Sequence, residues 1–129
     1  MPFVQITLRR GKGPEHIAAL VESVHRGLVE EFKIPESDKF QTVREVEPYQ
    51  LIFPPEYLAI PHTEDIVFIH ITCKEGRTVA MKKALFATVA RQISKRTGLS
   101  PDDVFIVISE NKAENWSFGR GLAQLASDS

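Results

Sequence analysis

The chain opens with a short segment in which hydrophobic and polar positions alternate. Val4, Ile6 and Leu8 fall on one side of an extended backbone, and the residues between them fall on the other. A period of two is the pattern of a β-strand with one buried face. We therefore predict a strand over residues 2–8, whose first residue is held in place where most chain termini fray.

A helical pattern follows, and then a second strand. After a glycine-containing turn, Pro14 stands at a favoured first helical position, and apolar residues recur every three or four positions as far as Phe32. Residues 40–46 are predicted to form a strand. Residues 47–64 contain four prolines, so we expect a connection in which only residues 50–53 could form a short strand. The apolar helical positions are Ile17, Leu20, Val21, Val24, Leu28, Val29 and Phe32.

The same order of patterns then recurs in the second half. A strand rich in β-branched residues over 66–72 is followed by a turn, a helix over 77–95 and a strand over 104–108. The two halves superpose without a gap at a constant offset, that between Asp38 and Asp103. Other matched pairs are Phe3 with Phe68, Ile6 with Ile71, Leu20 with Leu85, Val24 with Val89, and Phe40 with Phe105.

This repeat predicts the fold. Residues 2–46 and 66–110 form two β-α-β units of one domain, which spans residues 1–129. Because right-handed crossovers make the strands of each unit parallel, the units join into a four-stranded mixed sheet with two helices on one face, an α/β (α+β) fold. The strands of the second half are apolar on both sides, so the other face is expected to be buried against further subunits.

Composition excludes several classes of protein. With 43% hydrophobic and 26% charged residues, the chain resembles a soluble globular protein, and its net charge of −1 argues against nucleic acid binding. A lone cysteine, Cys73, excludes an internal disulfide. No apolar leader or membrane-length apolar run is present, so we expect a cytoplasmic protein without membrane contact. The four histidines lack metal-ligand spacing, and no metal site is expected.

The first candidate for chemistry is Pro2. Removal of Met1 before so small a residue leaves a free secondary amine at the start of the first strand. In the repeat, Pro2 is equivalent to Val67, an internal residue, so only the first half can present such an amine. The alternative is that Pro2 is an ordinary second residue.

Three further features are expected near the same end of the sheet. Asp38 precedes the second strand, where it either takes part in chemistry or caps a turn, as the equivalent Asp103 indicates. Arg77 stands at the expected start of the second helix, where the helix dipole disfavours a cation, so it points to a bound carboxylate. Trp116 and Phe118, two residues apart in a glycine-flanked segment, either line a pocket or pack on a neighbouring subunit.

Together these features resemble the tautomerase superfamily, whose enzymes are built on a β-α-β repeat with an N-terminal catalytic proline. Within it the chain is most similar to malonate semialdehyde decarboxylase. The resemblance covers essentially the whole chain, and Pro2 and residues 35–41, 76–78 and 110–119 carry it.

The resemblance implies a homotrimeric enzyme acting on small oxo acids without a metal or an organic cofactor. It makes Pro2 the catalytic amine, Asp38 its hydrogen-bonding partner or water activator, Arg77 the carboxylate binder, and Trp116 and Phe118 an apolar wall.

The chain departs from the family pattern before the second helix. Some of these decarboxylases carry two arginines spaced by one residue there, whereas this chain has Arg77 alone. Lys74 is the candidate substitute, although a point charge does not replace a guanidinium fork. The departure bears on the substrate more than on the superfamily.

The charge of the Pro2 amine decides between two reactions. A protonated amine polarises the carbonyl of a 3-oxo acid and promotes decarboxylation, while a neutral amine moves protons as a base in keto–enol tautomerisation of a phenylpyruvate-like 2-oxo acid. Hydration of a halogenated or acetylenic acid by water activated near Asp38 is a further option. The alternative from another class is a non-catalytic oligomeric binding protein, which a retained Met1 would indicate.

Overall fold

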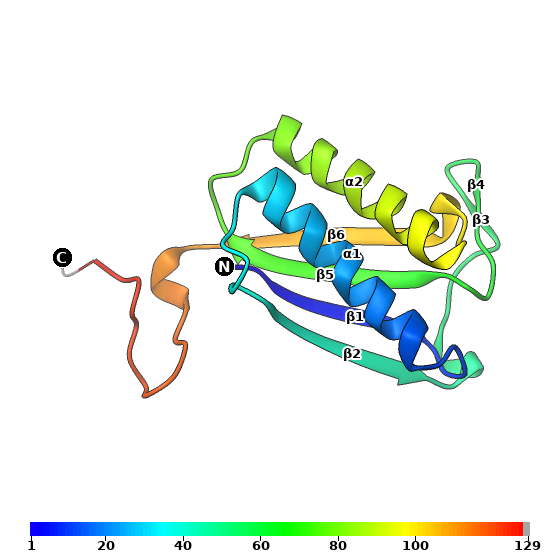
Figure 1. The fold of residues 1–129 in the computed structure, drawn as a ribbon, viewed down its shortest axis with the longest axis horizontal. Helices are drawn as coiled ribbons and strands as arrows, with labels where there is room; N and C mark the ends of the chain where they lie inside the picture. The colour runs from blue at the N-terminus through cyan, green and yellow to red at the C-terminus, as the bar shows by residue number, and fades with distance from the viewer. Residues whose placement is uncertain (128–129) are drawn as a thin grey trace.

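The computed structural model describes residues 1–127 as a sheet covered on one face by two helices (Figure 1). Four strands form the sheet in the order β2-β1-β5-β6. The first unit consists of β1 (Phe3–Arg9), α1 (Pro14–Phe32) and β2 (Phe40–Val46), and the second of β5 (Val67–Lys74), α2 (Val79–Thr97) and β6 (Val104–Asn111). The predicted fold class, a duplicated β-α-β unit with a mixed sheet, is confirmed.

Strand pairing brings the two units together edge to edge. β1 runs parallel to β2 with Phe3 opposite Phe40, and β5 runs parallel to β6 with Phe68 opposite Phe105. The central pair, β1 and β5, is antiparallel. The starts of β1 and β2 therefore lie at the same end of the sheet as the ends of β5 and β6.

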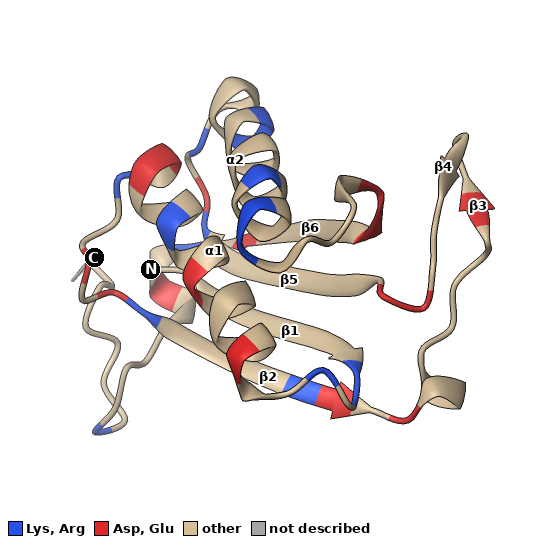
Figure 2. Cartoon of the chain, turned by 45° about the vertical axis from the view of Figure 1, so that its right-hand side comes forward, with Lys and Arg blue, Asp and Glu red and all other residues tan. Residues whose placement is uncertain are grey.

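The core lies between the sheet and the helices. Val4, Ile6 and Leu8 point into it with at most 3% of their surface exposed, which confirms the alternation predicted for the first strand. The helices approach each other closely where Gly27 faces Val89, because a Cβ added at Gly27 would lie 2.6 Å from Val89 Cγ2. Figure 2 shows that the charged residues lie mainly on helices, loops and strand ends, so the central strands β1 and β5 carry little charge.

The opposite face of the sheet is open in the single chain. Phe105 and Val107 on β6 are each 45% exposed, and Phe40 at the start of β2 is 53% exposed. Both helices cover the other face (Figure 1). The open face thus carries exposed apolar residues for which the sequence predicts cover from other subunits, together with the polar Gln5, Thr7 and His70.

Residues 47–64 differ from the prediction. The segment expected to offer a strand at residues 50–53 instead begins with a short 3-10 helix, Pro48–Gln50. A two-stranded hairpin follows, formed by β3 (Glu56–Tyr57) and β4 (Ile60–Pro61). Its turn is made by Leu58 and Ala59, whose φ angles are 51° and 64°. Neither residue is the glycine or asparagine by which such turns are recognised in a sequence.

The second helix begins later than predicted. Thr78 is its N-cap, with its side chain accepting a hydrogen bond from the Met81 N–H, and α2 starts at Val79. Arg77 therefore precedes the helix, and the prediction that it opens the helix at residue 77 was wrong. Both strands of the second unit run further than predicted, because Lys74 and Asn111 pair with each other at their ends.

Candidate functional site

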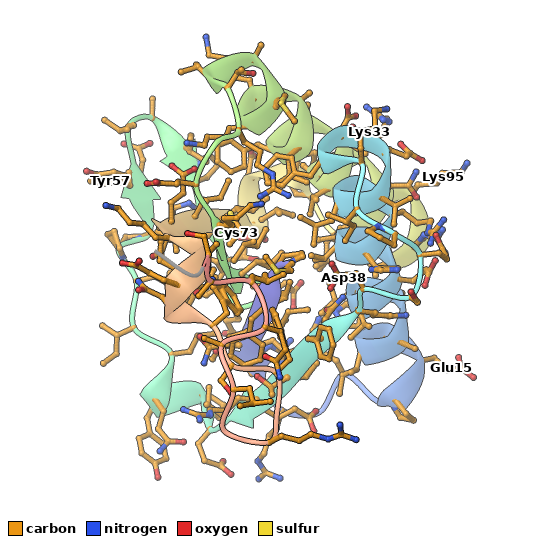
Figure 3. The ribbon with its side chains drawn as sticks, turned by 90° about the vertical axis from the view of Figure 1, so that its left-hand side faces the viewer. Glu15, Lys33, Asp38, Tyr57, Cys73 and Lys95 are labelled. Atoms are coloured by element: carbon orange, nitrogen blue, oxygen red, sulfur yellow. The ribbon has the colours of Figure 1, made fainter. Side chains whose placement is uncertain are left out.

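Most of the predicted site residues gather at one end of the sheet. Strand register brings together Pro2, which precedes β1, Asp38, which precedes β2, and the residues that follow β5 and β6. Figure 3 looks onto this end, with Asp38 and Cys73 labelled. The antiparallel pairing of β1 with β5 is what makes the beginning of the chain meet Arg77 and Trp116, which are distant in sequence.

The amino terminus lies against Asp38. Pro2 is buried, and the Met1 amino nitrogen is 3.2 Å from Asp38 Oδ2. The amine in this contact belongs to Met1, and in a chain that has lost Met1 the terminal amine is that of Pro2, one residue further along. Both side chains of the pair are 16% exposed, so this contact is largely shielded from water.

The loop that carries Asp38 is fixed to α1. The Asp38 N–H donates to Pro35 O at 3.0 Å, and His25 Nε2 lies 2.8 Å from Glu36 O, to which it donates. Burial, followed by the charges of Lys39 and Arg26, lowers the pKa of His25, so the neutral ring with a protonated Nε2 is favoured. This bond holds the backbone two residues before Asp38, and it fits the packing role expected of a histidine without a metal partner.

A cavity of about 290 Å³ opens beside Pro2. The rings of Trp116 and Phe118 form one wall, stacked with 5.8 Å between their centroids and 23° between their planes. The structure thus brings three predicted residues, Pro2, Trp116 and Phe118, into one cavity. Its lining residues are Met1, Pro2, Phe3, Phe40, Trp116, Ser117 and Phe118.

Arg77 lies at the same end but does not line the cavity. Its Nη1 donates to Lys74 O at 2.9 Å, and its guanidinium carbon is 5.0 Å from the centroid of the Phe32 ring. Burial raises the pKa of the Cys73 thiol, while the positive charges of Arg77 and the amino terminus oppose the rise. Arg77 and the terminal amine therefore both influence the same buried residue, although Arg77 is not one of the lining residues.

Lys74 is the last residue of β5, with an exposed side chain. Its backbone carbonyl holds Arg77, and its side chain is not part of the cavity lining. Asp38 likewise stands behind the terminal amine and outside the lining. None of these three charged candidates lines the cavity, whose walls are mainly apolar.

Sequence reasoning missed three contributors, Phe3, Phe40 and Asn111. Phe3 and Phe40 line the cavity because they are opposite each other in the β1–β2 register. The signal for Phe3 was its place in the alternation, on the side away from the core. Asn111 Oδ1 accepts a hydrogen bond from Trp116 Nε1 at 2.5 Å, and only the tertiary structure reveals this partner.

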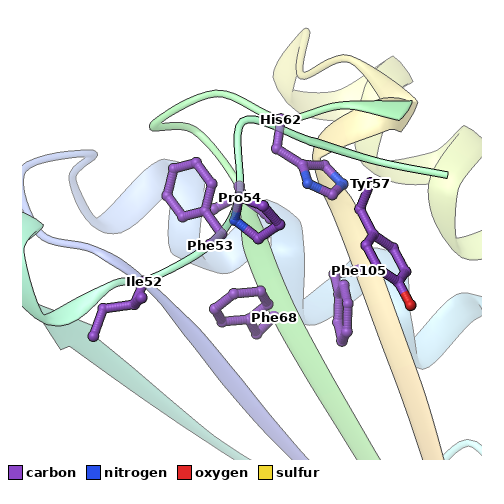
Figure 4. A pocket seen from close by; sticks show the side chains of 8 residues that line it. Ile52, Phe53, Pro54, Tyr57, His62, Phe68 and Phe105 are labelled. Carbon is purple, nitrogen blue, oxygen red and sulfur yellow. The ribbon is translucent and has the colours of Figure 1, made fainter. Parts of the chain in front are cut away.

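A second cavity, of about 360 Å³, lies at the other end of the sheet and contains none of the predicted site residues (Figure 4). Phe68 and Phe105 meet edge-on in it, with 5.1 Å between ring centroids. Its histidine, His62, has Nδ1 shielded from solvent and without a hydrogen-bond partner. The other residues that line this cavity are mainly apolar.

Residues 1–127 contain neither a candidate metal site nor a candidate membrane-spanning helix. No group of three or more His, Cys, Asp or Glu side chains in this range could hold a metal ion. No helix in the same range is both long enough and apolar enough to cross a membrane.

Comparison with known proteins agrees with this geometry. Two family descriptions, both of tautomerase enzymes, match residues 38–119 and residues 2–59. The probable tautomerase YusQ of Bacillus subtilis is 40% identical over 97% of this chain and 98% of its own. The probable tautomerase YrdN of the same organism is 28% identical over 96% of this chain and 95% of its own.

Solved structures extend the comparison to the fold. A malonate semialdehyde decarboxylase (FG41) inhibited by 3-bromopropiolate has a TM-score of 0.89 and 34% identity over 95% of this chain and 92% of its own. Another malonate semialdehyde decarboxylase, described with decarboxylase and hydratase activities, has the same TM-score at 26% identity, over 95% of each chain. A symmetric trimer of fused 4-OT, at 19% identity over 95% of this chain and 97% of its own, shares the fold with a TM-score of 0.78. The chain belongs to the tautomerase superfamily, in which it is similar to malonate semialdehyde decarboxylase.

Proposed function

We propose that the protein uses the Pro2 amine to act on small oxo acids, with decarboxylation of a 3-oxo acid such as malonate semialdehyde as its main reaction. The observation that carries the proposal is a buried Pro2 in an aromatic-walled cavity, with the chain's amino end against Asp38. Similarity to two malonate semialdehyde decarboxylases supports the choice of reaction.

The first requirement is removal of Met1, which converts Pro2 into a terminal secondary amine. The Asp38 carboxylate favours the protonated form of an amine at this place, whereas burial and the positive charge of Arg77 favour the neutral form. Decarboxylation needs the protonated form.

In the proposed reaction Arg77 binds the substrate carboxylate and protonated Pro2 polarises the aldehyde oxygen. The bond between the carboxylate carbon and C2 breaks, and its electron pair forms the C2=C3 double bond of an enol as carbon dioxide leaves. The aldehyde oxygen takes up the proton, and protonation of C2 then gives the aldehyde. The rings of Trp116 and Phe118 exclude water from one side of the reacting carbons. Asp38 holds the amine, and Lys74 adds positive charge near the turn that carries Arg77.

The second candidate is keto–enol tautomerisation of a phenylpyruvate-like 2-oxo acid. The observation that favours it is the 40% identity to a probable tautomerase. Here neutral Pro2 removes a proton from carbon or from the enol oxygen and returns it to the other position. The same cavity serves both reactions, and the protonation state of Pro2 selects between them.

The proposed assembly is a cytoplasmic homotrimer that needs no metal or organic cofactor. The exposed Phe105 and Val107 give the open sheet face an apolar surface suited to burial against other copies. Fused 4-OT, which shares this fold, forms trimers.

Intact mass before and after treatment with 3-bromopropiolate tests the role of Pro2. We expect a mass without Met1 and a single adduct that maps to Pro2, and Arg77→Ala should slow its formation. Acetaldehyde formed from malonate semialdehyde then identifies a decarboxylase, while an ultraviolet change with phenylenolpyruvate identifies a tautomerase. A retained Met1, or the absence of an adduct at Pro2, rejects the catalytic proposal in favour of a non-catalytic oligomeric binding protein.

A further inference from the structure

We propose that Asn111 is a positioning residue, whose side-chain oxygen fixes the indole of Trp116 and so sets the aromatic wall of the cavity. The consequence for substrate binding rests on the proposed function, whereas the positioning itself does not. Asn111 is the last residue of β6 and does not line the cavity, so it acts through Trp116.

The hydrogen bond between these two residues can take only one form. An indole offers a single donor, Nε1–H, and no acceptor. Trp116 Nε1 is 2.5 Å from Asn111 Oδ1, so the amide oxygen must face the indole. With this donor engaged, Trp116 presents an apolar ring to the cavity and has no N–H left for a substrate oxygen.

The backbone of Asn111 has a second role on the opposite side. Glu75 N–H donates to Asn111 O at 2.7 Å, which ties the end of β6 to the turn after β5. The same turn holds Arg77, whose Nη1 donates to Lys74 O at 2.9 Å. Asn111 thus joins the aromatic wall, through its side chain, to the turn that carries the candidate carboxylate binder, through its main chain.

These two contacts can be separated by mutation. Replacing the side chain removes the bond to Trp116 and leaves the main-chain bond to Glu75 intact. Loss of the acceptor leaves the half-buried indole N–H to seek water, which loosens the ring from its stacked position against Phe118. The structure therefore assigns the side chain of Asn111 an effect on the wall and not on the Arg77 turn, which the main chain of Asn111 contacts.

The chain contains a single tryptophan, so its fluorescence reports on Trp116 alone. For Asn111→Ala we expect a red-shifted emission and a roughly twofold or larger increase in acrylamide quenching, because water reaches the freed indole. Asn111→Asp, which keeps an acceptor oxygen, should retain most of the wild-type emission. Lys112→Ala, which alters the neighbouring exposed side chain, is the matched control and should match the wild type.

Kinetics of inactivation by 3-bromopropiolate measure the consequence for the site. Asn111→Ala removes one hydrogen bond that orders the wall, so 3-bromopropiolate should inactivate this variant about three- to tenfold more slowly than the wild type. Asn111→Asp should be inactivated at a rate closer to that of the wild type. Circular dichroism confirms that each variant is folded.

The two readouts distinguish the inference from the proposed function. Unchanged emission and quenching in folded Asn111→Ala overturn the positioning role, whatever the kinetics show. If emission shifts while wild type and Asn111→Ala are inactivated equally fast, positioning stands but its effect on binding is rejected. If wild-type Pro2 does not react at all, the proposed function fails, and the fluorescence comparison still decides the role of Asn111.

Discussion

The two β-α-β units have the same arrangement of strands and helix, and they differ in the groups that lie at the strand ends. Phe3 pairs with Phe40, and the equivalent Phe68 pairs with Phe105. The Pro2 cavity and the second cavity also correspond under this equivalence. The Pro2 cavity contains Met1, Phe3 and Phe40, and the second cavity contains the equivalent residues Ile66, Phe68 and Phe105.

The equivalent aspartates show the difference most directly. Asp103 is 3% exposed and accepts hydrogen bonds from Thr63 N–H at 2.8 Å and Thr63 Oγ1–H at 2.6 Å. Asp38 faces the terminal amine instead, at 3.2 Å from the Met1 nitrogen. In the second unit the preceding chain occupies the place that the chain terminus has in the first.

The two cavities have matching frames but differ in chemistry, because the first lies at a chain terminus and the second lies beside continuous chain. Val67, the equivalent of Pro2, is an internal strand residue with 1% of its surface exposed. Its nitrogen is an amide and has no basicity. The carboxylate of Asp103 accepts structural hydrogen bonds from Thr63, while that of Asp38 faces the ionisable terminal amine.

Replacement of Pro2 and of its equivalent Val67 gives the largest expected contrast. Pro2→Ala should lower kcat/KM for whichever oxo acid the wild type turns over by about 10²- to 10⁴-fold, because in the proposed reaction the secondary amine performs the proton transfer. Val67→Ala should cost roughly 1–3 kcal/mol of stability through a core cavity and leave kcat/KM of the folded protein unchanged. Steady-state kinetics and urea unfolding of both variants check the contrast. Similar kinetic losses in the two variants would contradict it.

Replacement of the two aspartates sharpens the same comparison. Asp103→Ala should lower the free energy of unfolding by about 2–3 kcal/mol, because the Thr63 donors lose a buried acceptor. Asp38→Ala should lower the free energy of unfolding by less than about 1 kcal/mol, because the partner of Asp38 is a chain terminus, which can move to bring its freed amine into water. The same change should lower kcat/KM roughly tenfold or more, through loss of a charged partner of the amine. Equal stability losses would show that Asp38 is a structural residue like Asp103.

The smallest expected effect concerns pH. The loop before β2 is held by His25, whereas the equivalent loop before β6 is held by the Ser94 hydroxyl, which donates to Leu99 O at 2.7 Å. Because burial lowers the pKa of folded His25 below its ordinary 6.5, the unfolded chain binds the proton more readily. Stability from this residue is therefore complete above pH 6.5 and declines as the pH falls.

Urea unfolding at pH 7.5 and pH 5.5 measures this decline. Burial and the positive charges of Lys39 and Arg26 lower the pKa of His25, and together they outweigh the attraction of Glu22 and Asp38 for the proton. His25→Gln, which keeps a donor for Glu36 O, should reduce the pH dependence. Both proteins should carry His16→Gln, because the pKa of His16 is lowered as well. If the difference in unfolding free energy between the two pH values is the same with and without His25→Gln, His25 is excluded as a source of the pH dependence.

Much of the fold could be predicted from the sequence because its strongest patterns are local. The alternation of Val4, Ile6 and Leu8 and the helical period from Ile17 to Phe32 need only the chain's own geometry. The hairpin at residues 56–61 was missed because Leu58 and Ala59 adopt positive φ without the usual residue types. Arg77 was placed inside the second helix because Thr78, the N-cap of that helix, was not recognised in the sequence.

For the candidate site, the residue types were predictable and their contacts were not. Pro2, Trp116 and Phe118 were singled out by chain position, rarity and spacing, and the structure brings them into one cavity. That Arg77 rests on Phe32, and that Trp116 is bonded to Asn111, depends on how strands and turns meet in space.

The sequence by itself determined the strand–helix–strand repeat and the apolar face of each element. Only the tertiary structure decided that Asp38 faces the amino terminus while the equivalent Asp103 is buried against Thr63. The physical reason is that periodicity constrains which face of an element is buried, whereas side-chain partners depend on how the strands pair. The antiparallel pairing of β1 with β5 places residues from the beginning of the chain beside residues more than sixty positions further along.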